Sequence, residues 1–416
     1  MSAPPSCGPL PVQPAALVLD NGVRGLCVER PHSPTFALQL FARAGSRHDG
    51  RRPGLAHLVE HLVFRAPRAG RPDLFAVVEG RGGEVGATTT RDYMSFSLVV
   101  AAPDAERALA LLPALVRPPA IDRASLRGER QVIGHELRER VRPADALWDL
   151  LLAALWGDVP LARPPGGSLA ALADLTATAA AAFHARRFSA PHLLVVGAGA
   201  CPPAAFAAAL RAALDDLPLV QGASPAVAPQ ARPSALEACG GGTGSYVAVG
   251  IAVPGVEHPD SAALRLLEGV LGQGPGSRLG RALAARGLTA AVQTRCAAYA
   301  GVGVFAALAA TPAANGEAVA AALETEVRSL AARPPTATEI RMARRRQWGA
   351  LYRRCESNAG LASALGTAAL FGPAHRPPEA ALPESLPVAG ATVRRAAREH
   401  LATAPFARAT LHAGGG

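Results

Sequence analysis

Two histidines and a glutamate form the most chemically specific pattern in this chain of 416 residues. His57 and His61 are four residues apart, and Glu60 follows His57 by three residues. In an α-helix, this spacing places all three side chains on nearly the same side. Two imidazoles one turn apart can bind one zinc ion, and the carboxylate between them can reach a water molecule on that ion. The pattern is H-x-x-E-H, the inverse of H-E-x-x-H. The alternative is a buried helix whose two histidines are satisfied within the core.

The residues around this motif predict the helix that would position it. Pro53 and Gly54 are suited to a helix start, and Pro67 to its end. Apolar residues recur between them at helical spacing: Leu55, Leu58, Val59, Leu62 and Val63. One face of the helix should therefore pack inward.

A catalytic zinc takes three protein ligands and keeps one position open, so a third ligand is needed. The candidate is Glu136, in a helix expected over 122–141. Glu129 is seven residues earlier, and two helical turns put both carboxylates on one face to within about 20°. The alternative is an ordinary solvated helix, because Arg and Glu alternate through this segment.

At this point the chain resembles the pitrilysin/insulinase family of zinc metallopeptidases, which includes the mitochondrial processing peptidases. That family carries H-x-x-E-H and, about 75 residues later, E-R-x-V-I-x-x-E; both patterns stand here at that separation. The resemblance implies that His57, His61 and Glu136 bind Zn²⁺. It also implies that Glu60 is the general base and that Glu129 is an auxiliary carboxylate of the catalytic site.

Residues 84–101 read as a β-hairpin, with Arg91 and Asp92 near its turn. In the family, a strand with the pattern G-G-x-x-N-A-x-T takes the substrate backbone as an added strand. The resemblance therefore implies substrate binding at Gly86, Ala87 and Thr88. Gly86 stands where the family has Asn, so one polar contact to the peptide is missing or supplied elsewhere.

The second half of the chain repeats the first. A strand over 246–253 and a helix over 262–271 align with the strand and the helix that carries the motif, but Arg265 and Gly269 replace the two histidines.

The expected fold is α+β, with two homologous α/β-roll domains that each pack an antiparallel-rich sheet against helices. The expected domains are 1–215, which bears the metal, and 244–416, which has no metal ligands; a linker at 216–243 joins them. Other elements are expected as strands at 16–30, 35–44 and 193–196, and as helices at 73–79, 104–116, 144–156, 170–188, 202–214 and 337–354.

The second half also departs from the family. A stretch like L-R-E-K-G-L-A-Y-S-V normally holds the substrate and the developing oxyanion through its Arg and Tyr, but here those positions are Ala284 and Ala290. The expected function is therefore that of a zinc endopeptidase subunit acting on short or unfolded peptides, with leader-peptide processing as one use. Its expected partner is a homologous zinc-less subunit that supplies the Arg/Tyr pair. Arg278, Arg281 or Arg286 could substitute and permit a homodimer, and the alternative function is a non-catalytic assembly subunit.

Composition limits the other classes of function. The net charge of +10 comes entirely from arginine, with no lysine, which indicates codon bias rather than selection for a polyanion. Nucleic-acid binding is therefore not expected. No apolar run reaches about 18 residues, so no membrane span is expected. No signal peptide is visible, and six cysteines without a C-x-x-C pair fit a reduced, cytoplasmic protein.

Overall fold

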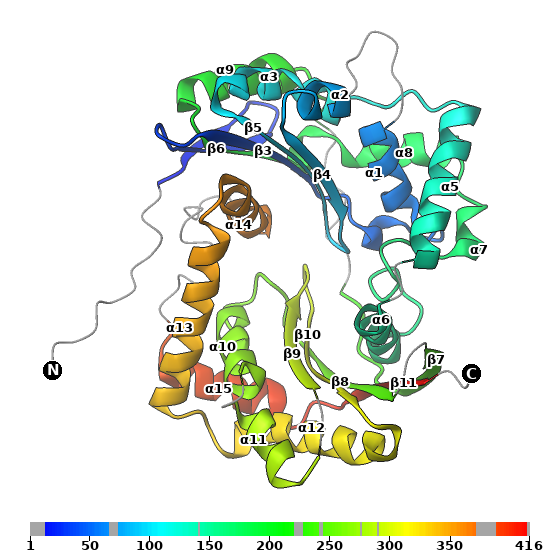
Figure 1. Cartoon of the computed structure of the whole chain (residues 1–416), viewed down its shortest axis with the longest axis vertical. Helices are drawn as coiled ribbons and strands as arrows, with labels where there is room; N and C mark the ends of the chain where they lie inside the picture. The colour runs from blue at the N-terminus through cyan, green and yellow to red at the C-terminus, as the bar shows by residue number, and fades with distance from the viewer. Residues whose placement is uncertain are drawn as a thin grey trace, which may run out of the picture.

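The computed structural model describes residues 13–65, 74–139, 142–219, 228–240, 244–274, 277–288, 291–371 and 388–413. Within these residues the chain forms two sheets, each with helices on both faces (Figure 1). The α+β class and the two-domain architecture predicted from the sequence are confirmed.

The first sheet has six strands in the order β1-β2-β6-β3-β5-β4. Their bounds are β1 Ala15–Val18, β2 Arg24–Glu29, β3 Thr35–Ala42, β4 Glu84–Thr89, β5 Met94–Ala101 and β6 Leu193–Gly199. The pair β2–β6 is parallel, and the other described pairs are antiparallel. The single strand expected over 16–30 is wrong, because a turn at Asn21-Gly22 divides it into the hairpin β1–β2.

Most helices of the first half cover the outer face of this sheet. Their bounds are α1 Leu55–Arg65, α2 Leu74–Glu79, α3 Ala105–Ala110, α4 Leu112–Val116, α5 Arg123–Glu139, α7 Leu169–Leu172, α8 Ala177–Arg187 and α9 Pro203–Leu214. The predicted apolar face of α1 is buried in the core of this half. The single helix expected over 170–188 is wrong: the Thr176 hydroxyl accepts the backbone N–H of Ala179 and caps α8, which separates it from α7.

The second sheet has five strands in the order β7-β11-β8-β10-β9. Their bounds are β7 Ala235–Gly240, β8 Ser245–Val253, β9 Ala291–Ala298, β10 Gly303–Thr311 and β11 Ala407–Ala413. The helices on its outer face are α10 Ser261–Gly272, α11 Arg278–Ala285, α12 Gly316–Ala332, α13 Ala337–Arg354 and α15 Gly390–Leu401. Strand β7 lies inside 216–243, so part of the expected linker pairs with β11 in the second sheet. The exact domain boundaries remain predictions.

The inner face of each sheet is covered by a helix from the other half (Figure 1). Helix α6, Pro143–Trp156, packs Leu151 and Leu155 against the second sheet. Helix α14, Asn358–Phe371, packs Leu361 and Leu365 against the first sheet. Each half thus completes the core of the other.

A buried ion pair joins Arg47, in the short 3-10 helix Ser46–His48 after β3, to Asp92 in the β4–β5 turn. Arg47 also donates to the carbonyl of Ala300 (3.0 Å), and the backbone N–H of Ala300 donates to Asp92 (3.2 Å). The β4–β5 turn is thereby tied to the β9–β10 turn, which fixes the C-terminal end of β4.

None of the helices in the described ranges combines the length and the apolar composition that a membrane span requires.

Candidate metal centre

The start of α1 is held by a carboxylate and by a crossing loop. Asp49 accepts the backbone N–H groups of Gly54 (2.7 Å) and Ala56 (2.8 Å), as a helix-capping side chain does. Burial raises the pKa of the Asp49 carboxyl to about 7, against these hydrogen bonds. Gly54 and Gly167 both have positive φ, and a Cβ on Gly167 would lie 2.6 Å from the carbonyl oxygen of Pro53. Only glycine allows this close approach, which orients the first turn of α1.

One turn further, α1 presents His57, Glu60 and His61 together. One potential ligand atom from each lies within 4.8 Å of the other two. The two imidazole rings are edge to face, with centroids 4.7 Å apart. Glu60 and His61 are buried, and His57 is half-buried. The predicted motif helix therefore brings its three polar side chains to one place.

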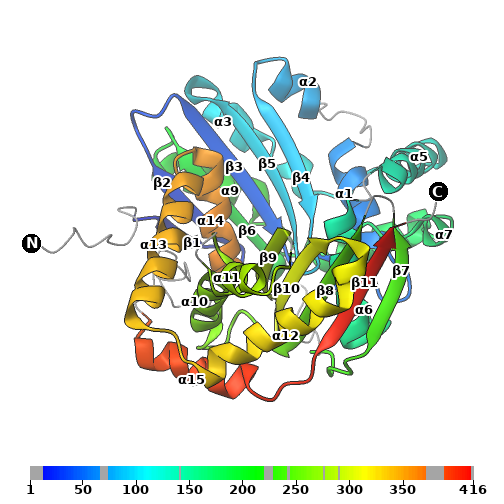
Figure 2. The same ribbon diagram turned by 60° about the horizontal axis from the view of Figure 1, so that its bottom comes forward.

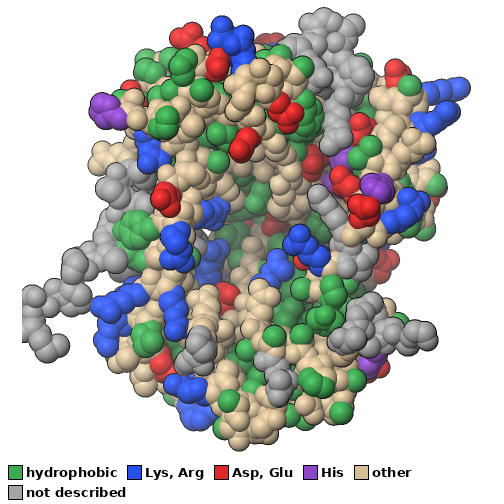
Figure 3. All heavy atoms as spheres, in the orientation of Figure 1, with side chains coloured by type: hydrophobic (Ala, Val, Ile, Leu, Met, Phe, Trp, Pro, Cys, Tyr) green, Lys and Arg blue, Asp and Glu red, His purple; other side chains and the backbone are tan. Residues whose placement is uncertain are grey.

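Helix α5 adds the carboxylate of Glu136. Its Oε2 lies 3.7 Å from Nε2 of His57 and 3.8 Å from Nε2 of His61. Bonds of about 2.0–2.1 Å in a tetrahedral zinc site would put ligand atoms roughly 3.3–3.5 Å apart. The donor set of two imidazoles and a carboxylate, at nearly this spacing, fits a zinc ion. In the space-filling view, histidine and acidic side chains gather over the region of α1 and α5 (Figure 3).

Glu129 precedes Glu136 by two turns of α5, and its carboxylate contacts His61. Its Oε2 lies 3.0 Å from Nδ1 of His61. A proton on Nδ1, shared with this carboxylate, leaves Nε2 unprotonated and directed towards Glu136. Glu129 thus orients His61, a predicted metal ligand.

Thr89 is a contact of the site that the sequence reasoning missed. Its hydroxyl donates a hydrogen bond to Oε2 of Glu60. Thr89 is the last residue of β4 and matches the final Thr of the G-G-x-x-N-A-x-T pattern, so the signal was present in the motif. The strand predicted to bind substrate therefore ends at a residue that contacts Glu60, the predicted base.

Strand β4 lies at the edge of its sheet, beside α1 (Figure 2). It carries the predicted substrate-binding residues Gly86, Ala87 and Thr88. At Gly86, the departure from the family's Asn has a local reason, because a Cβ there would lie 2.9 Å from the hydroxyl of Ser97. That hydroxyl donates to the carbonyl of Gly86 (3.3 Å). Any larger side chain at position 86 would require Ser97 to move.

Of the two positions of the missing Arg/Tyr pair, the structure describes only Ala284. Ala284 is exposed on α11, in the second half, and Ala290 lies outside the described residues. Of the arginines considered as substitutes, Arg278 is already held by Glu339, at 2.7 and 2.8 Å. Arg278 is therefore not free to contact a substrate.

Fold and site together define a two-domain α/β protein with an inverted H-x-x-E-H cluster in its first half. The chain belongs to peptidase family M16, the insulinase family. The family model described as "Insulinase (Peptidase family M16)" matches residues 26–167, and the model described as "Peptidase M16 inactive domain" matches residues 174–347.

Proteins named uncharacterized zinc proteases from Mycobacterium bovis and Mycobacterium tuberculosis are each 30% identical over 285 residues. The alignment spans 65% of this chain and 65% of theirs. Subunit 1 of the mitochondrial cytochrome b-c1 complex of Bos taurus is 26% identical over 263 residues, 61% of this chain and 54% of that protein.

Two solved structures share the whole fold. A protease from Helicobacter pylori superposes with a TM-score of 0.84 at 19% identity, over 96% of this chain and 99% of its own. A structure titled as a peptidase M16 inactive domain, from Pseudomonas fluorescens, gives 0.81 at 24% identity, over 98% and 99%. At these identities, the likeness concerns the fold.

Proposed function

We propose that this chain is the metal-bearing subunit of a zinc endopeptidase that cleaves short or unfolded peptides. The observation that carries the proposal is the convergence of His57, His61 and Glu136 from two helices, with Glu60 beside them. Membership of a peptidase family and the names of the mycobacterial relatives support it.

A zinc ion held by His57, His61 and Glu136 would supply Lewis-acid activation of a water molecule and of the scissile carbonyl. Glu60 then accepts the proton of the attacking water and returns it to the leaving amine. Thr89 fixes one oxygen of Glu60, so that the other is directed to the reaction. Glu129 keeps His61 in the tautomer that a metal ligand needs.

The free edge of β4 suits a peptide in extended conformation. Added-strand pairing uses main-chain hydrogen bonds and makes little demand on side chains. A peptide paired with Gly86–Thr88 would run towards Thr89 and therefore towards Glu60. A segment must be unfolded to pair in this way, so folded proteins are poor substrates.

A homologous partner completes the proposal. Without the guanidinium and phenol of the family pattern, the chain lacks two donors to a developing oxyanion, and losing one such donor costs about 10²–10³ in rate. A zinc-less partner that carries both residues would restore them as a heterodimer. A homodimer using Arg281 is the second form of the assembly.

The test is hydrolysis of an unfolded polypeptide by the zinc-loaded chain, alone and mixed with a homologue that lacks H-x-x-E-H but carries the Arg and Tyr. We expect slow cleavage by the chain alone and cleavage about a hundredfold faster in the mixture. If a chain with stoichiometric zinc cleaves nothing in either case, the peptidase proposal fails.

The second candidate is a non-catalytic subunit of a larger assembly. The specific observation in its favour is the similarity to a cytochrome b-c1 complex subunit. In that case the zinc-loaded chain would not hydrolyse peptides even with the partner present.

A further inference from the structure

A pocket of about 740 Å³ lies in the second half, between α11, α12 and the start of α13. Four arginines and two glutamates line it: Arg278, Arg281, Arg286, Arg333, Glu326 and Glu339. It is formed by other residues than the metal centre, and of its lining residues only Arg281 enters the proposed function, as the substitute arginine of the homodimer.

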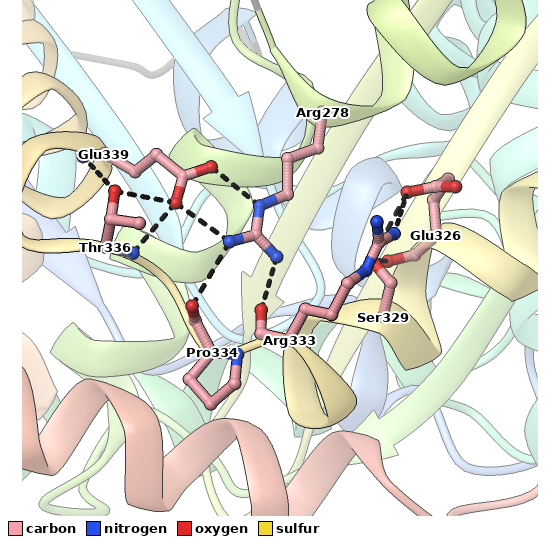
Figure 4. A network of polar contacts seen from close by, with 7 residues as sticks. All are labelled: Arg278, Glu326, Ser329, Arg333, Pro334, Thr336 and Glu339. Carbon is pink, nitrogen blue, oxygen red and sulfur yellow. Dashed lines mark hydrogen bonds and ion pairs between the residues drawn. The ribbon is translucent and has the colours of Figure 1, made fainter.

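One wall of the pocket is a neutral, fixed pair. Arg278 donates to both oxygens of Glu339 and to the carbonyl of Arg333 (2.6 Å), as Figure 4 shows. The hydrogen bonds from Arg278 lower the pKa of Glu339 to about 2. Thr336 and Glu339 also form a capping box at the start of α13. This wall therefore has no charge left for a ligand.

Of the other three arginines, Arg286 and Arg333 share one carboxylate, that of Glu326. Arg286 and Arg333 each approach Glu326 at 3.5 Å, the outer limit of a hydrogen bond. Glu326 is buried, and the Arg333 side chain points towards it and Ser329 in Figure 4. Arg281 is exposed, and its side chain makes no hydrogen bond or ion pair with any residue of the described ranges. Three guanidinium groups against one carboxylate leave an excess of two positive charges.

We propose that this pocket binds a phosphate group, either as inorganic phosphate or as the monoester of a small molecule. A phosphate dianion matches the excess of two charges, whereas a single carboxylate matches half of it. Guanidinium groups present parallel N–H donors that suit phosphate oxygens. Arg281 is the primary contact, and Arg286 and Arg333 turn from Glu326 to the ligand.

The test is calorimetric titration of the full-length chain with inorganic phosphate and with phenyl phosphate at low ionic strength, because salt screens exposed charges. We expect saturable binding of at least one, and Arg281→Ala should weaken it at least about tenfold. Arg398→Ala is the matched control, since Arg398 is an exposed arginine on α15; it should leave the affinity unchanged. Glu326→Gln should tighten binding by releasing Arg286 and Arg333.

Binding of phosphate itself identifies a free-anion site, and binding of phenyl phosphate alone identifies an ester site. The proposal is overturned if neither ligand gives saturable binding. It is equally overturned if Arg281→Ala and Arg398→Ala weaken binding to the same extent, because the attraction would then follow net charge. Peptidase activity does not enter this test.

Discussion

Helices α1 and α5 in the first half, and α10 and α13 in the second, occupy equivalent places, but their contacts differ. Helix α5 begins at Arg123 and α13 at Ala337, so Glu129 and Ala343 are each the seventh residue of their helix. Glu129 meets His61, and Ala343 meets Gly269, the residue that aligns with His61. A Cβ added to Gly269 would lie 3.2 Å from Cβ of Ala343.

The difference shows what a metal centre requires of this scaffold. At the contact between α1 and α5, which carries imidazoles and carboxylates, the two helices enclose a set of donors at metal-ligand spacing. At the equivalent contact between α10 and α13, which carries Gly269 and Ala343, the two helices pack directly and leave no room for an ion. The architecture alone does not make the site.

Glu268, the counterpart of Glu60, survives in the second half. Burial raises its pKa to about 7, and the backbone N–H of Cys296 opposes this rise. It has a carboxylate but no histidine at the aligned positions Arg265 and Gly269. A half-buried glutamate without histidines beside it is thus the matched control for Glu60, the proposed base.

The largest expected effect is that of Glu60→Gln in the reconstituted peptidase. Removing the base should lower kcat by about 10²–10⁴ while zinc content stays constant. Glu268→Gln should leave kcat unchanged, because Glu268 lies beside no metal ligands. Steady-state hydrolysis of one fluorogenic peptide by both variants checks this, and equal loss in the two would remove the distinction between the halves.

Glu129→Gln should weaken zinc binding about 10–100-fold, because His61 loses the carboxylate that orients it. Glu139→Gln on the same helix is the control, since Glu139 is exposed. Competition with a zinc-binding dye measures both affinities. An unchanged affinity in Glu129→Gln would show that the contact with His61 does not support the metal.

Gly269→His should fail to create a second site and instead force α10 and α13 apart. We expect a loss of about 1–3 kcal/mol in the free energy of unfolding. Gly128→Ala in α5 is the control, because a Cβ there meets no atom within 4 Å, and it should be neutral or stabilising by up to about 1 kcal/mol. Chemical denaturation measures both. A stable Gly269→His variant would mean that the close crossing does not exclude a ligand.

Thr89→Val should lower kcat roughly tenfold with KM unchanged, because the hydrogen bond to the charged base is lost while the edge strand remains. Thr89→Ser keeps the hydroxyl and should restore most of the rate. A rise in KM alone would instead place Thr89 in peptide binding.

The sequence predicts the motif helix, the α5 carboxylates, the β4–β5 hairpin and the internal repeat, because each has a periodic or spaced signal within one segment. It does not predict the exchange of α6 and α14 between the halves, since either sheet offers an apolar face to an apolar helix. Strand β7 is missed because its pairing with β11 joins residues far apart in the chain. Thr89 matches the strand motif, but its contact with Glu60 depends on how β4 packs beside α1, which spacing along the chain does not predict.

Zinc stoichiometry tests the central claim most directly. After dialysis against trace zinc, elemental analysis should give one zinc per wild-type chain and well under a tenth in His61→Ala and Glu136→Ala. Full zinc content in either variant, or none in the wild-type chain, would contradict a metal centre built from α1 and α5.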